Sequence, residues 1–229
     1  RVLFRSACNT ATAAAIHEVR SSHPDLPLVG LEPAIKPALA VTKTGHVGVI
    51  GTRGTLTSAK FGKLMASLAD QAHFVVQPCD GLAHAVERSV TLPATTASNA
   101  VNNTETGALC ERYVHAMGPF GTAAGQMDTL VLGCTHYIFV EHELRALVGP
   151  DVRFIDTGEP VARQTRRLLE AAGLLRQTKP PDDSGEPQAP TDAAPPVQLL
   201  TTGPVSMLEA AAQRWLQLPA RCCSTVSVP

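Results

Sequence analysis

The chain has 229 residues, 44% of them hydrophobic, so it can bury a sizeable core in one large domain or two modest ones. Its 19 lysines and arginines nearly balance its 20 aspartates and glutamates, so no net charge attracts nucleic acid or an anionic membrane. No apolar run reaches the length of a membrane span, and Val2–Phe4 is too short for the hydrophobic part of a signal peptide. We expect a cytoplasmic protein whose partner is a small molecule.

In the first half of the chain, short apolar runs alternate with longer helical runs, a pattern typical of parallel strands with helices on both faces. Asn9 or Thr10 can cap the first helix, and Pro24 ends it. The predicted elements are a helix to about Arg20, a strand over 26–31, a helix from about 34 to 45, a strand over 46–52, a helix over 58–69, a strand over 73–79 and a helix over 82–90.

The second half repeats this alternation. The run "DTLVLGC" (128–134) is continuously apolar, which favours a strand covered on both faces. Residues 179–196 carry six prolines and almost no bulky apolar residue, so they are predicted to form a disordered or extended loop. The other predictions are a loop over 91–103, helices over 105–117, 140–148 and up to Gly173, strands over 152–158 and 197–203, a helix over 205–217 and a last strand near 224–228.

The six cysteines include no Cys-x-x-Cys pair and no spacing typical of zinc ligands, so we predict no metal site. Cys134 ends an apolar strand and is followed closely by His136, and Cys8 stands just before a helix. Ligands of open parallel sheets bind at the carboxyl ends of strands, where helix N-termini favour thiolates. These two cysteines are therefore candidate reactive thiols, although two packed thiols give the same pattern. Cys79 also ends a strand but has no neighbouring base, which favours a structural role.

Five strings, in their order and spacing, resemble the glutamate racemases, which belong to the cofactor-independent aspartate/glutamate racemase family. They are "ACNTATAAAI", "LEPAIKPA", "VGVIGTRGTL", "DTLVLGCTHY" and "FIDTGEPVARQTRRLL". The resemblance covers essentially the whole chain except the proline-rich loop. The strings "ACNTA" and "GCTHY" are specific together, because each marks one catalytic cysteine of that family.

The resemblance implies an α/β fold of two similar doubly wound parallel-sheet lobes, which face each other across a cleft. Glutamate would lie in the cleft with Cys8 and Cys134 on opposite faces of its α-carbon, and His136 would assist Cys134. The implied substrate contacts are Asn9, Thr10, Thr52, Thr135 and His136. For Thr52 a plain helix cap is the alternative.

The implied activity is a cofactor-independent isomerase reaction that interconverts L- and D-glutamate and supplies D-glutamate for peptidoglycan. Two thiols suit this chemistry, because one removes the α-proton from one face and the other returns a proton to the opposite face. No lysine lies in an evident pyridoxal phosphate context, which is in keeping with direct deprotonation. The resemblance leaves a homodimer as the assembly to be tested.

The sequence also departs from the family pattern. Full-length members carry Asp-Ser-Gly and Pro-Tyr-Gly segments ahead of the first catalytic cysteine, and here Asp183–Gly185 occurs only in the proline-rich loop. Charges at Arg1 and Arg5 also suit a buried strand poorly. We therefore expect a fragment, inactive as given, with an incomplete first lobe (1–31 and 160–229) and a second lobe at 32–159. A racemase for aspartate or a related acid and a non-catalytic binding remnant remain the alternatives.

Overall fold

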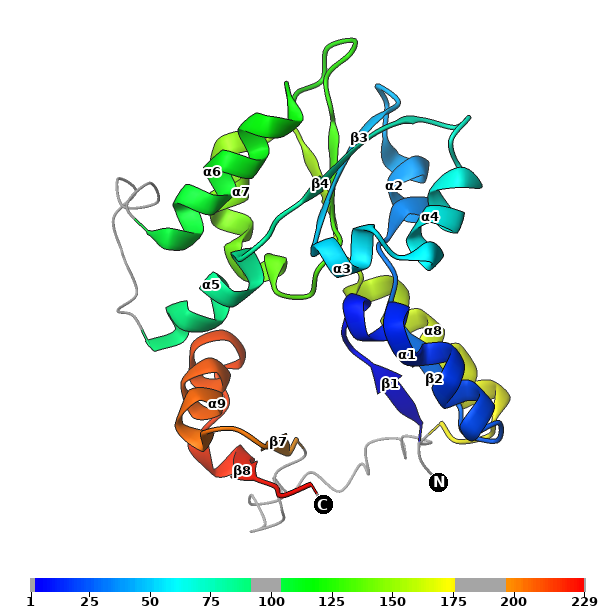
Figure 1. Ribbon diagram of the computed structural model, residues 1–229, viewed down its shortest axis with the longest axis vertical. Helices are drawn as coiled ribbons and strands as arrows, with labels where there is room; N and C mark the ends of the chain where they lie inside the picture. Colours follow the sequence, from blue (N-terminus) through cyan, green and yellow to red (C-terminus); the bar gives the residue numbers. More distant parts are fainter. Residues whose placement is uncertain (1–2, 92–103, 176–196, 229) are drawn as a thin grey trace, which may run out of the picture. The chain divides into compact units, whose positions relative to one another are not determined.

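The computed structural model describes residues 3–91, 104–175 and 197–228 (Figure 1). These residues form two compact units: one contains 3–86 and 104–175, and the other contains 87–91 and 197–228. Strands and helices alternate and every strand pair is parallel, which confirms the predicted α/β class. The boundaries of the two expected lobes, at 31/32 and 159/160, stay a prediction.

The first unit contains a four-stranded parallel sheet in the order β4-β3-β5-β6. Every residue of β5 is buried, as its continuously apolar sequence predicts. Because the strands are parallel, their carboxyl ends lie along the same edge of the sheet. The strands are β3 His46–Gly51, β4 His73–Pro78, β5 Thr129–Leu132 and β6 Arg153–Ile155.

Helices cover both faces of this sheet (Figure 1). Val47 and Val49 pack into a buried cluster with Ile35 of α2 and Phe61 of α4. Gly48, between the two valines, faces the opposite side, where an added Cβ would come within 2.8 Å of Met117 Cε in α6. The helices of this region are α2 Ile35–Val41, α3 Arg53–Leu56, α4 Ala59–Ala66, α5 Leu82–Arg88, α6 Glu105–Met117 and α7 Glu141–Val148, with a 3₁₀ turn at Tyr137–Val140. The last two residues of α5 and the 3₁₀ turn Ser89–Thr91 after it belong to the second unit.

A second sheet of the same unit pairs β1 (Phe4–Ser6) with β2 (Leu28–Gly30) in parallel. The expectation that the charged start of the chain would not suit a strand is wrong, because β1 forms there. The expectation assumed that the charge of Arg5 would be buried, but the Arg5 side chain is exposed and its charge stays in water. The helices α1 (Asn9–Ser22) and α8 (Gly158–Ala171) belong to the same region.

The second unit pairs β7 (Leu199–Thr201) with β8 (Cys223–Thr225) in parallel. The helix α9 (Val205–Ala211) joins them, and a π-helical turn over Ala212–Leu216 extends it. Arg214 donates a hydrogen bond of 2.9 Å to the carbonyl oxygen of Ser89, which holds the two segments of this unit together.

Most predicted elements are confirmed, and their ends differ for identifiable reasons. The helix expected to reach residue 45 ends at Val41, because the Asp128 carboxylate accepts hydrogen bonds from the amides of Lys43 and Thr44 and so holds them outside the helix. The helix expected over 205–217 ends where Gln217 adopts a left-handed conformation with φ of 54°. The loops predicted over 91–103 and 179–196 lie, apart from Thr91, outside the described residues.

Candidate active site

Cys134 follows the fully buried strand β5, at the edge where the parallel strands of the main sheet end. Its sulfur lies 3.7 Å from Nδ1 of His136, within hydrogen-bond range for sulfur. Both side chains are partly exposed, so a small molecule can reach them. The pair predicted from sequence adjacency is therefore in contact, and it has the geometry for exchanging a proton.

Tyr137 holds the turn that carries Cys134 and His136. Its side chain is fully buried, its amide donates to the carbonyl oxygen of Cys134 at 3.1 Å, and its hydroxyl donates to the carbonyl oxygen of Cys79 at 3.3 Å. Burial raises the pKa of this hydroxyl, so it remains a donor. Sequence reasoning missed this contact because the bond joins residues 58 positions apart.

Cys8 is the N-cap of α1 rather than Asn9 or Thr10, which corrects the prediction of the cap. Its sulfur accepts a hydrogen bond of 3.5 Å from the amide of Ala11, and the side chain is exposed. The helix that starts here has 14 residues, so the partial positive charge of its N-terminus lies beside this sulfur. Cys8 thus combines access with an electrostatic environment suited to a reactive sulfur.

A group of three threonine hydroxyls joins the start of α1 to the end of β3. Thr10 Oγ1 lies 2.7 Å from Thr52 Oγ1 and 3.0 Å from Thr55 Oγ1, and the last two lie 3.0 Å apart. Thr52 is also the N-cap of α3, where its hydroxyl accepts from the amide of Thr55 at 3.4 Å. The alternative interpretation of Thr52 as a helix cap is therefore confirmed, and its side chain meets a second predicted site residue as well.

Thr55 is a member of this group that sequence reasoning missed. It is buried, and it lies three residues after a capping threonine in "GTRGTL". This spacing could have predicted the contact, because the side chain of the third helical residue can lie close to that of the N-cap.

Asn9 is almost fully buried, with 3% of its surface exposed. Neither its amide oxygen nor its amide nitrogen has a hydrogen-bond partner among the residues of the described ranges. Buried polar atoms are nearly always paired, and leaving one unpaired costs about 1–3 kcal/mol. Asn9 also lines a narrow cavity together with Thr55, Glu32 and Lys60. An unsatisfied amide next to a candidate reactive cysteine is well suited to binding a polar ligand.

The remaining predicted residue, Thr135, lies between Cys134 and His136 and is partly exposed. Cys79, in contrast, is buried, and burial raises the pKa of its thiol to about 12. Such a thiol stays protonated near neutral pH, which supports the structural role expected for it. Within residues 3–91, 104–175 and 197–228, no three His, Cys, Asp or Glu side chains gather to hold a metal ion. No helix in the same ranges is long and apolar enough to cross a membrane.

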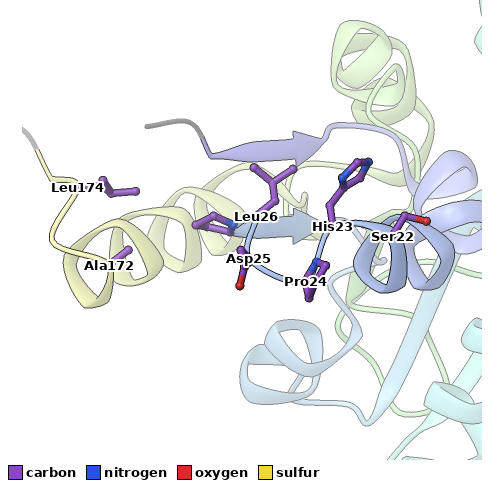
Figure 2. Close-up of a pocket in the computed structure, with 8 residues that line it drawn as sticks. Ser22, His23, Pro24, Asp25, Leu26, Ala172 and Leu174 are labelled. Atoms are coloured by element: carbon purple, nitrogen blue, oxygen red, sulfur yellow. The ribbon is translucent and has the colours of Figure 1, made fainter.

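A surface pocket of about 640 Å³ lies away from these residues, at the other end of α1 (Figure 2). Ser22, His23 and Pro24 line it from the end of that helix, and Ala172 and Leu174 line it from the segment after α8. A helix of 14 residues is roughly 20 Å long, so the pocket is remote from Cys8. It contains none of the predicted site residues.

Comparison with known proteins places these observations in a family. The Asp/Glu/Hydantoin racemase family matches residues 6–165. The glutamate racemase of Pseudomonas putida strain W619 is 46% identical over 169 residues, which make up 74% of this chain and 58% of that protein. The chain thus spans less than two thirds of the length of that curated relative.

Two solved structures resemble the chain over most of its length. The crystal structure of a glutamate racemase from Bacillus anthracis has a TM-score of 0.70 and 28% identity, and the match covers 98% of this chain and 73% of that one. The Escherichia coli glutamate racemase, solved with L-glutamate and the activator UDP-MurNAc-Ala, has a TM-score of 0.68 and 26% identity. That match covers 93% of this chain and 70% of the other.

Proposed function

The chain belongs to the Asp/Glu/Hydantoin racemase family, and we propose that it interconverts L- and D-glutamate by proton transfer at the α-carbon. Curated relatives of 46% identity are glutamate racemases, and the similar Escherichia coli enzyme was solved with L-glutamate. The proposal includes two lobes (1–31 with 160–229, and 32–159), a cytoplasmic location and a supply of D-glutamate for peptidoglycan.

In the proposed reaction, Cys8 and Cys134 act on opposite faces of the substrate. One sulfur, as thiolate, takes the α-proton and leaves a planar carbanion, and the other, as thiol, donates its proton to the opposite face. For the other enantiomer the two roles are exchanged. His136, 3.7 Å from Cys134, assists that sulfur in taking and giving its proton, whereas Cys8 relies on the amide groups at the start of α1.

Asn9, Thr10, Thr52 and Thr135 are proposed to bind the polar groups of the substrate. The observation that carries the proposal is the 2.7 Å hydrogen bond between Thr10 and Thr52. It attaches the start of α1, which carries Cys8, to the edge of the sheet that carries Cys134. The unpaired amide of Asn9 supports the same location, since the carboxylate or ammonium group of an amino acid would satisfy it.

The test measures racemisation and hydrogen exchange together. The chain is incubated with L- or D-glutamate in deuterated water, both alone and joined to the parts of a relative that it does not cover. We expect no turnover by the chain alone, and in the joined protein we expect solvent deuterium on the α-carbon of the inverted product, because the donating thiol has exchanged with the solvent. Aspartate is tested in parallel, and faster inversion of aspartate would instead favour the related-acid alternative. Absence of exchange in the joined protein, or strict dependence on added pyridoxal phosphate, would refute the two-thiol reaction.

A further inference from the structure

Thr12 lies one helical turn after Cys8 in α1, and the proposed chemistry gives it no part. Its side chain is fully buried, which is uncommon for threonine. The hydroxyl accepts a hydrogen bond of 3.0 Å from the amide of Leu31, just after β2, and it lies 3.0 Å from Oγ and 3.3 Å from the carbonyl oxygen of Ser6, at the end of β1. One hydroxyl therefore joins α1 to the carboxyl ends of two strands.

The methyl group of Thr12 is held as closely as the hydroxyl. A Cβ built on Gly30 would lie 2.6 Å from Thr12 Cγ2, so the methyl occupies the space where a side chain at position 30 would otherwise lie. Threonine has few rotational states at χ1, and here both branches are fixed by contacts on the β2 side. The orientation of Thr12 is consequently determined by the sheet and not by the helix alone.

These contacts enclose the segment that carries the reactive sulfur. Ser6 comes two residues before Cys8, and the amide of Thr12 donates to the carbonyl oxygen of Cys8 at 2.9 Å. Between these fixed points, the amide of Ala11 donates to the Cys8 sulfur at 3.5 Å. If the hydroxyl of Thr12 is lost, the first turn of α1 loses these hydrogen bonds to the ends of both strands. The 3.5 Å sulfur contact is then supported only by the threonine group on the β3 side and by the backbone of the helix itself.

We propose that Thr12 is a positioning residue that holds the Cys8 sulfur against the first-turn amides of α1. The inference rests on the proposed role of Cys8 as one of two acid/base thiols, but it concerns the reactivity of that sulfur and does not require turnover. Thr12 touches neither the substrate nor the reacting atoms, and it acts through the segment from Ser6 to Cys8.

The test compares Thr12→Val, which keeps the shape and removes the hydroxyl, with Thr12→Ser, which keeps the hydroxyl. The readout is the rate at which iodoacetamide alkylates Cys8 near neutral pH, with Cys134 in the same molecule as the internal reference, both quantified by peptide mass spectrometry. We expect alkylation of Cys8 to slow by about two- to fivefold in Thr12→Val, because the sulfur is no longer held against the amides at the start of α1. Thr12→Ser should restore the native rate, and Cys134 should be unchanged in both variants.

Circular dichroism identifies variants that fold. A folded Thr12→Val variant whose Cys8 reacts at the native rate, or whose Cys8 and Cys134 slow equally, would overturn the proposal. If Thr12→Val does not fold, Ser6→Ala removes one hydrogen-bond partner of the hydroxyl and should slow Cys8 by a smaller factor, and an unchanged rate there would also overturn it. Failure of the proposed function would appear differently, as no racemisation by the chain joined to the missing parts of a relative, and would leave the alkylation result unaffected.

Discussion

Thr10 and Thr52 lie 42 residues apart in the sequence, and their hydroxyl oxygens share a hydrogen bond of 2.7 Å. Thr55 completes the group, at 3.0 Å from each of the other two hydroxyls. Because each hydroxyl can donate one hydrogen bond and accept two, the three can bond to one another and still accept a further bond. It fixes the N-terminus of α1, and with it Cys8, against the end of β3.

The threonine group should contribute measurably to stability. Replacing Thr52 by valine keeps the side-chain shape, removes two hydrogen bonds to hydroxyls and removes the side-chain cap of the Thr55 amide, which keeps its 3.0 Å bond to the Thr52 carbonyl oxygen. We expect the free energy of unfolding in urea to fall by about 1–2 kcal/mol. Thr52→Ser, which retains the hydroxyl, is the matched control and should lose less than half of that. Equal losses in both variants would mean that packing of the methyl group dominates.

Asp128 should make stability depend on pH in the acid range. Burial alone would raise the pKa of this carboxyl, but hydrogen bonds from the hydroxyl of Thr42 and the amides of Lys43 and Thr44 outweigh burial and lower the pKa from 3.8 to about 2. Because the pKa is lower in the folded chain than in the unfolded chain, the ionised carboxyl stabilises the folded state at pH values above 3.8. This stabilisation is lost as the pH falls toward about 2. We expect a loss of about 2 kcal/mol between roughly pH 5 and pH 2.

Urea unfolding at a series of pH values checks this expectation. Asp128→Asn should be less stable than the native chain near neutral pH and should show a flatter profile below about pH 4, because the titrating group is gone. Asp151→Asn, at an exposed position, is the matched control and should keep the native profile. A native profile in Asp128→Asn would show that other carboxyl groups carry the acid dependence.

The location of Cys134 could be predicted because it follows from topology. Strands of a parallel sheet end along one edge, so a cysteine that closes an apolar strand must lie there, and His136 is too close in sequence to Cys134 to lie far away. The fold class followed from the alternation of apolar runs in the same way. Each of these inferences needs only local sequence and one general rule of sheet geometry.

The contacts that hold the site could not be predicted, because they join distant segments. The sequence around Thr12, Thr55 and Tyr137 is compatible with exposed polar residues on helices and turns. What buries them is the approach of β1 and β2 to Thr12, of α1 to Thr55 and of the residue after β4 to Tyr137, which periodicity does not describe. The strand at the start of the chain could not be predicted for a related reason. Its charged residues argue against a strand only where both faces are covered, and the sequence alone does not show that this strand leaves Arg5 exposed.

The buried cysteines should be inert in the native chain. Burial raises the pKa of both Cys79 and Cys110 to about 12, and their side chains are 2% and 0% exposed. We expect iodoacetamide to alkylate Cys8 in the native chain near neutral pH and to leave Cys79 and Cys110 unmodified, because they are neither accessible nor ionised. In urea all three should react. Native-state modification of Cys79 at a rate similar to that of Cys8 would place it among the reactive thiols instead.

His136 should activate Cys134 and not Cys8. The imidazole nitrogen lies 3.7 Å from the Cys134 sulfur, so His136→Asn removes a base that can take the proton of the Cys134 thiol. We expect the alkylation of Cys134 near neutral pH to slow by roughly three- to tenfold, while Cys8 in the same molecule is unchanged. His142→Asn, at an exposed position in α7, is the matched control and should leave both rates at their native values. Unchanged alkylation of Cys134 in His136→Asn would contradict the pairing.

The two-thiol reaction makes a prediction about the hand of the substrate that a single-base reaction does not. In the active protein, Cys8→Ala and Cys134→Ala each remove the acid or base from one face, so racemisation should fall by at least the 10²–10⁴-fold typical of a positioned proton donor or acceptor. Each variant keeps one thiol, which can still take the α-proton of the enantiomer that faces it and return solvent deuterium to the same face. Exchange without inversion should therefore survive for one enantiomer in Cys8→Ala and for the opposite enantiomer in Cys134→Ala, measured by proton NMR of the α-position.

Cys223→Ala, at a partly exposed cysteine in the other unit, is the control and should keep native turnover for both enantiomers. The same hand in both variants, or near-native turnover in either one, would show that the two sulfurs do not act on opposite faces.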